Sequence, residues 1–102
     1  MNIKSLAAKI AILLGASIIQ VAEAATVTFS LCNQYGTEAR SVVVKDKKDA
    51  LKKIFDALVE KGSCATIHAS SDDGKFAEIE VRIGQETPYS VPWIAPGDEV
   101  DF

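Results

Sequence analysis

The sequence contains few of the residues from which catalytic and metal sites are usually built. Its 102 residues include one histidine, His68, and two cysteines, Cys32 and Cys64. No G-x-S-x-G sequence or comparable catalytic motif is present. The acidic pairs, such as Asp72 and Asp73, do not have the spacing of an EF-hand calcium loop. We therefore expect no catalytic residue, no metal site and no cofactor.

Basic residues are also too few for a nucleic-acid-binding surface. Beyond residue 24 the chain has nine basic and thirteen acidic residues, a net charge of −4. A protein that binds a phosphate backbone needs an excess of positive charge on at least one face. This composition argues against a nucleic-acid partner.

A long hydrophobic run is missing as well. The longest one, residues 10–19, has about half of the ~20 residues that a membrane-spanning helix requires. Lys4 and Lys9 lie on its N-terminal side, and Ala22-Glu23-Ala24 follows it. A short apolar run between lysines and an A-x-A sequence is typical of a secretory signal peptide. We predict that residues 1–24 are a signal peptide cleaved after Ala24, the alternative being an uncleaved anchor or a buried core helix.

Export would place the product, residues 25–102, in the periplasm or outside the cell, without stable membrane insertion after cleavage. Both cysteines lie in this part, and two cysteines in a small exported domain indicate a disulfide. A Cys32–Cys64 bridge would close a loop of about 33 residues and stabilise the domain by ~3–4 kcal/mol. A redox role is the alternative, but it would be expected to use a C-x-x-C pair.

Residues 46–62 have the pattern of an amphipathic helix. Leu51, Ile54 and Leu58, together with Phe55, are spaced three and four residues apart, which places them on one helical face. Asp46 fits an N-cap, and Gly62 fits the left-handed residue that ends a helix. The sequence predicts a helix of about four turns here.

Most of the other segments alternate between apolar and polar residues, as half-buried strands do. Residues 41–45 instead contain three consecutive valines, which favour a strand. The predicted strands cover residues 26–32, 41–45, 64–70 and 75–83, with an edge strand or an extended cover at 89–93 and a short strand at 99–102. Asp73-Gly74 indicates a tight hairpin between the third and fourth of them. The predicted fold is α+β: one domain with a mainly antiparallel sheet of four to six strands, an amphipathic helix packed on one face, and the disulfide on the other.

Part of this succession of predicted elements resembles that of a known family. Over residues 40–83, the succession strand–helix–strand–turn–strand and the sequence KIFDALVEKG are similar to the small periplasmic stress- and biofilm-associated proteins of the YhcN type. The first strand, the two cysteines and the segment around Trp93 depart from that pattern. The resemblance therefore implies no site residue.

Four aromatic residues form the most specific candidate for a binding surface. Tyr89 and Trp93 lie in a segment interrupted by prolines, and Phe102 and Phe76 could extend the same surface. Such a platform would stack against a sugar ring or a partner's side chain. In the alternative, these aromatic side chains close the end of a small core. The 89–93 edge strand could also pair with a strand of a partner.

The expected function is a non-enzymatic binding protein of the bacterial cell envelope, with a protein or glycan partner. One alternative is a small inhibitor of an extracellular hydrolase. An alternative of another class is a small secreted enzyme that uses His68 with a carboxylate such as Glu78 or Glu80. The sequence leaves the oligomeric state open.

Overall fold

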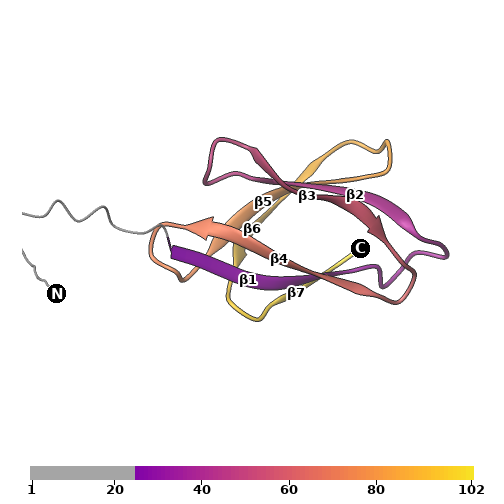
Figure 1. The fold of residues 1–102 in the computed structure, drawn as a ribbon, viewed down its shortest axis with the longest axis horizontal. Helices are drawn as coiled ribbons and strands as arrows, with labels where there is room; N and C mark the ends of the chain where they lie inside the picture. The colour runs from indigo at the N-terminus through magenta and orange to yellow at the C-terminus, as the bar shows by residue number, and fades with distance from the viewer. Residues whose placement is uncertain (1–24) are drawn as a thin grey trace, which may run out of the picture.

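The computed structural model describes residues 25–102, which form a β-sandwich of seven strands (Figure 1). The predicted signal peptide and its cleavage site lie outside the described residues. The strands are β1 (Ala25–Cys32), β2 (Arg40–Asp46), β3 (Lys52–Val59), β4 (Cys64–Ser71), β5 (Ala77–Ile83), β6 (Tyr89–Ile94) and β7 (Glu99–Asp101).

The strands form two sheets. The smaller sheet has the order β4-β1-β7, in which β1 is antiparallel to β4 and parallel to β7. The larger sheet has the order β3-β2-β5-β6 and is antiparallel throughout. The hairpins β2–β3 and β5–β6 both belong to the larger sheet. The chain crosses between sheets after β1, β3, β4 and β6.

One hydrophobic core fills the space between the sheets. Alternate residues of β1 and β4 point inward, among them Phe29 and Ile67, and they meet Val44, Ile79 and Val81 of the larger sheet. The alternation of apolar and polar residues in the sequence therefore corresponds to an alternation of buried and exposed side chains, as expected when one face of each sheet is buried.

The predicted α+β fold is wrong, because residues 46–62 form no helix. They form the end of β2, a turn, β3 and the connection to β4, and no helix packs on either sheet within residues 25–102. β3 pairs with β2 along its length, but the register shifts between Val44 and Lys45, so that Ile54 is the extra residue of a β-bulge. The bulge allows the consecutive side chains of Ile54 and Phe55 both to pack against the core. Adjacent apolar residues are typical of a helical face, and here a bulge gives them the same burial.

Two further details of the predicted sheet need correction. The turn that contains Asp73-Gly74 does not form a hairpin within one sheet, because β4 and β5 belong to different sheets. Gly74 still has the expected left-handed conformation, with φ 78°. The predicted single sheet of four to six strands is in fact two sheets of three and four strands.

The predicted Cys32–Cys64 disulfide is present. The two cysteines are direct partners in the β1–β4 register, and their Cα atoms are 4.0 Å apart. Because Leu31 points into the core, Cys32 beside it points to the outer side of the smaller sheet, although it is almost fully buried. The bridge fixes one end of the β1–β4 pair.

Two buried polar side chains hold the connections. Asn33, 0% exposed, donates hydrogen bonds to the carbonyl oxygens of Glu38 and Val59 and accepts one from the amide of Gly36. Asp46, 1% exposed, accepts hydrogen bonds from the amides of Lys48 and Ser70 at 3.0 and 2.7 Å. The second of these joins the end of β2 to the edge strand of the other sheet.

Within residues 25–102, no helix is long and apolar enough to cross a membrane.

Candidate functional site

An unusual backbone conformation occurs in β6, at the edge of the larger sheet. Val91 pairs with Ile79 and Ile94 pairs with Ala77, so that Pro92 and Trp93 together stand opposite a single residue of β5. This is a β-bulge, and Trp93 within it has φ 60°. The left-handed conformation at a bulge is usually occupied by glycine, because a Cβ atom there is disfavoured. Here a tryptophan occupies it.

The bulge directs the indole of Trp93 away from the core. The residue is 74% exposed, and its ring meets the ring of Phe76 edge to face, with centroids 5.6 Å apart and planes at 88°. Phe76 immediately precedes β5, in the connection that follows β4. The two aromatic rings thus come from segments 17 residues apart in the chain and form a perpendicular corner on the surface.

This corner is part of a cleft of about 320 Å³ that we call the Trp93 cleft. Its lining residues are Lys48, Phe76, Ala77, Glu78, Pro92 and Trp93. Four of the six are apolar, and the other two carry charges of opposite sign. The turn between β2 and β3 contributes Lys48, so the cleft depends on the hairpin that replaces the predicted helix.

Neighbouring polar groups fix the charged side of the cleft. The ammonium of Lys47 donates a hydrogen bond to the hydroxyl of Ser90 at 2.9 Å and lies 3.5 Å from the carboxylate of Glu78. The ammonium of Lys48 lies 3.5 Å from the carboxylate of Asp72. These partly exposed pairs contribute little to stability, about 0–1 kcal/mol each, but they restrict where the charges lie.

The four aromatic residues proposed from the sequence do not form one surface. Phe76 and Trp93 meet, whereas Tyr89 lies at the other end of β6, paired in register with Val81. Burial, and to a smaller extent the charge of Glu86, raises the pKa of the Tyr89 phenol. Phe102 packs partly against the core, and its carbonyl oxygen accepts hydrogen bonds from the amides of Gln34 and Tyr35. It therefore belongs to the end of the sandwich that holds the disulfide.

Sequence analysis missed the charged residues of the cleft. Lys48 falls within the predicted helix 46–62 and Glu78 within the predicted strand 75–83, and neither was predicted to line a binding surface. Pro92, next to Trp93, was the available signal, because a proline in an edge strand often accompanies a bulge.

The structure does not bring His68 together with the carboxylates that an enzyme would need. His68 lies on the outer face of the smaller sheet, where its Nδ1 is 2.9 Å from the hydroxyl of Thr28. Glu78 and Glu80 alternate with buried residues on β5 of the other sheet, so they point to the opposite outer face of the sandwich. The core separates the two sets of side chains.

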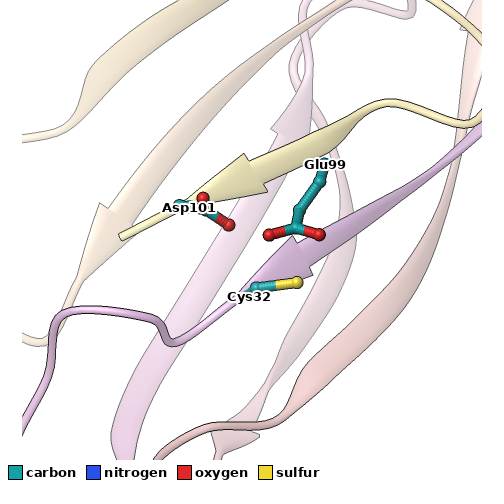
Figure 2. A group of neighbouring side chains, drawn as sticks. All are labelled: Cys32, Glu99 and Asp101. Atoms are coloured by element: carbon teal, nitrogen blue, oxygen red, sulfur yellow. The ribbon is translucent and has the colours of Figure 1, made fainter.

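A group of possible metal ligands, Cys32, Glu99 and Asp101, lies where β7 joins β1 (Figure 2). The sulfur of Cys32 belongs to the disulfide, so it cannot act as a thiolate ligand. Two exposed carboxylates remain. A hydrogen bond from one to the other, and then the negative charge of Asp101, raise the pKa of Glu99. The pair is thus explained by the protein itself, and we do not assign a cation to it.

Two other acidic residues near turns, Asp98 and Asp73, form hydrogen bonds within those turns. Asp98 accepts a hydrogen bond from the amide of Ala95, and Asp73 accepts one from the amide of Lys75. The second hydrogen bond lowers the pKa of Asp73.

A second hollow, of about 50 Å³, lies on the outer face of the larger sheet beside Glu80 and Arg82, and it is too small for more than about one or two water molecules.

Comparison with known proteins gives no match: no family model fits the chain, and no curated protein or solved structure is significantly similar to it. The resemblance to proteins of the YhcN type depended on a helix over residues 46–62. Because that segment is a hairpin, the structure removes the basis of the resemblance.

Proposed function

We propose that this chain is an exported, non-enzymatic binding protein of the bacterial cell envelope, and that the Trp93 cleft is its contact site. The observation that carries the proposal is a tryptophan that is 74% exposed although its backbone is in the left-handed conformation.

The left-handed backbone conformation of Trp93 has an energetic cost. A non-glycine residue in the left-handed region costs about 1–2 kcal/mol. A buried tryptophan would offset this cost by removing apolar surface from water, but Trp93 buries only a quarter of its surface. Strain that stability does not explain is common at functional sites. A large exposed aromatic residue is also the kind of side chain that dominates binding energy in protein interfaces.

The structure favours recognition by side chains over pairing with a partner strand. Pro92 has no amide hydrogen to donate, and the bulge at Trp93 interrupts the outer edge of β6. Prolines and bulges at edge strands are the devices by which proteins prevent strand addition. The aromatic corner beside that edge remains accessible.

The disulfide supports export. Disulfides form and persist in oxidising compartments, and the two cysteines of the chain are paired with each other. The lysines, the short apolar run and the A-x-A sequence of residues 1–24 are consistent with the same route.

The proposal is tested by co-sedimentation of the oxidised protein, residues 25–102, with isolated bacterial envelope fractions. We expect saturable binding that falls at least about 10-fold in Trp93→Ala, because an aromatic anchor contributes 2 kcal/mol or more. Tyr35→Ala is the matched control. Tyr35 is equally exposed, at 76%, but it follows β1 at the disulfide end of the sandwich, away from the cleft. Equal binding by the wild type and Trp93→Ala would refute the proposal.

The alternative of an enzyme using His68 has a separate test. If His68 took part in a reaction, His68→Ala would abolish an activity without changing the fold. Because the nearest assigned partner of His68 is a threonine hydroxyl, we expect His68→Ala to bind envelope fractions as the wild type does.

A further inference from the structure

We infer that the ligand of the Trp93 cleft is a neutral pyranose ring, as found at the end or side of an oligosaccharide. This inference rests on the proposed function and adds the chemical class of the ligand. Three properties of the cleft lead to it: its perpendicular aromatic corner, its balanced charge and its complementary hydrogen-bonding groups.

The apolar part of the cleft suits a flat ring with one non-polar face. The indole of Trp93 and the ring of Phe76 stand at 88° to each other, and Pro92 adds to the apolar lining. The C–H groups on one face of a pyranose can stack on an aromatic ring, while the second ring borders the sugar edge. The volume of about 320 Å³ is at the lower end of the ~300–1,000 Å³ typical of small-molecule sites.

The charges in the cleft exclude two other ligand classes that bind aromatic pockets. A quaternary ammonium would be attracted to the indole and to Glu78, but the ammonium of Lys48 also lines the cleft and would repel it. A phosphate or uronate would pair with Lys48 but would meet the carboxylate of Glu78. A neutral ligand has no such conflict.

The two charged groups also complement hydroxyls. An ionised carboxylate only accepts hydrogen bonds and an ammonium only donates them, whereas a hydroxyl does both. Neighbouring hydroxyls on a pyranose can therefore donate to Glu78 and accept from Lys48. The ammonium of Lys47 lies 3.5 Å from the carboxylate of Glu78 and donates a hydrogen bond to the hydroxyl of Ser90, and these contacts restrict the position of the carboxylate. The combination of an apolar stacking surface with one donor and one acceptor is the pattern that a sugar requires.

The experiment is a fluorescence titration of the oxidised protein with neutral oligosaccharides of glucose, galactose and N-acetylglucosamine. Trp93 is the only tryptophan in the sequence, so its emission reports the cleft directly. We expect a saturable change in emission with at least one of the three. Choline and an oligogalacturonate serve as the cationic and anionic comparisons, and we expect both to bind at least about 10-fold more weakly.

Two variants on the same strand test the hydrogen-bonding role. We expect Glu78→Gln to weaken sugar binding about 10-fold, because hydrogen bonds to a charged group are roughly twice as strong as neutral ones. Glu80→Gln is the matched control. It removes the same charge two residues away on the same outer face, but Glu80 lines the other hollow and not the cleft. We expect its affinity for sugar to be unchanged.

Failure of this inference can be distinguished from failure of the proposed function. If none of the three neutral sugars changes the emission of Trp93 while binding to envelope fractions still depends on Trp93, the sugar assignment is wrong and the binding function stands. The sugar assignment is also wrong if choline or the oligogalacturonate binds more tightly than every neutral sugar. If envelope binding does not depend on Trp93 either, both the sugar assignment and the proposed function are wrong.

Discussion

At the scale of single residues, Glu99 and Asp101 place two carboxylates on one face of the short strand β7. The pKa of Glu99 is raised, first by its hydrogen bond with Asp101 and then by the charge of Asp101. A carboxyl whose pKa is raised on folding stabilises the protein fully at pH values below its unfolded pKa of about 4.3. This stabilisation is lost as the pH rises through the raised folded pKa.

The expected consequence is that Glu99→Gln unfolds less readily than the wild type at pH 7, because the variant removes the repulsion. The difference should narrow as the pH falls towards about 4, where Glu99 of the wild type is protonated. Urea unfolding at pH 7 and at about pH 4 measures this difference in the free energy of unfolding. Glu60→Gln, which removes one exposed carboxylate next to β3, is the control for the loss of a single negative charge. A Glu99→Gln variant that is less stable at pH 7 would contradict the assignment.

Residue-level chemistry could be predicted from the sequence only in part. Asp46 was expected to accept an amide hydrogen bond from the residues that follow it, and it does so from Lys48. The same local bond occurs at the start of a helix and in a hairpin turn, so it could not decide between them. The bond from Ser70 to Asp46 connects two sheets, and no local pattern indicates it. The contact between Phe76 and Trp93 is non-local in the same way.

At the scale of elements, the turn between β2 and β3 distinguishes the hairpin from the predicted helix. Ala50 and Leu51 both have left-handed backbones, with φ 52° and 58°. Neither residue is a glycine or asparagine, so nothing in the composition of this turn indicates it. In the hairpin, β3 pairs with β2 along its whole length, and a bulge packs the partly buried Ile54 and Phe55 against the core.

The variant Ala50→Gly tests this element directly. Glycine relieves a left-handed strain of about 1–2 kcal/mol, part of which is offset by the greater freedom of the unfolded chain. We expect the free energy of unfolding to rise by about 0.5 kcal/mol. In a helix the same change would lower it by about 1 kcal/mol. The sign of the change, measured by urea unfolding, separates the two structures.

Ala57→Gly provides the control for that experiment. Ala57 is exposed in the interior of β3, where glycine should cost about 0.5–1 kcal/mol. A loss of stability in both variants would contradict the left-handed conformation of Ala50 in the β2–β3 turn.

Six of the seven strands could be located from the sequence. Five of them alternate between apolar and polar residues because one face of the strand is buried, and β2 is marked by three consecutive valines. β3 was missed for a specific reason. Its apolar residues include the adjacent pair Ile54 and Phe55, which in a regular strand would point to opposite faces. A strand can bury both only through a bulge, and the sequence does not mark where the register of a partner strand shifts.

At the scale of the whole molecule, the sandwich separates its stabilising features from its proposed binding site. The disulfide, Asn33 and Phe102 lie at one end, where β1 ends and β4 begins. The Trp93 cleft is lined in part by residues of the β2–β3 turn and of the connection after β4. These two segments lie at the other end of the sandwich (Figure 1). The crossing of the chain between sheets brings Lys48, Phe76 and Trp93 together. This arrangement could not be predicted while the chain was expected to form one sheet, because the cleft requires the β2–β3 turn at that end.

We propose that Trp93 is held outward for a ligand and contributes little to the stability of the sandwich. The most direct test is the free energy of unfolding of Trp93→Gly, measured by urea titration with far-ultraviolet circular dichroism. Glycine removes the left-handed strain of about 1–2 kcal/mol, while the variant loses an aromatic contact worth about 0.5–1.5 kcal/mol. We expect a free energy of unfolding within about 1 kcal/mol of the wild type, together with loss of envelope binding. A loss of about 3–5 kcal/mol, as for removal of a buried aromatic side chain, would show that Trp93 belongs to the core and would contradict the account.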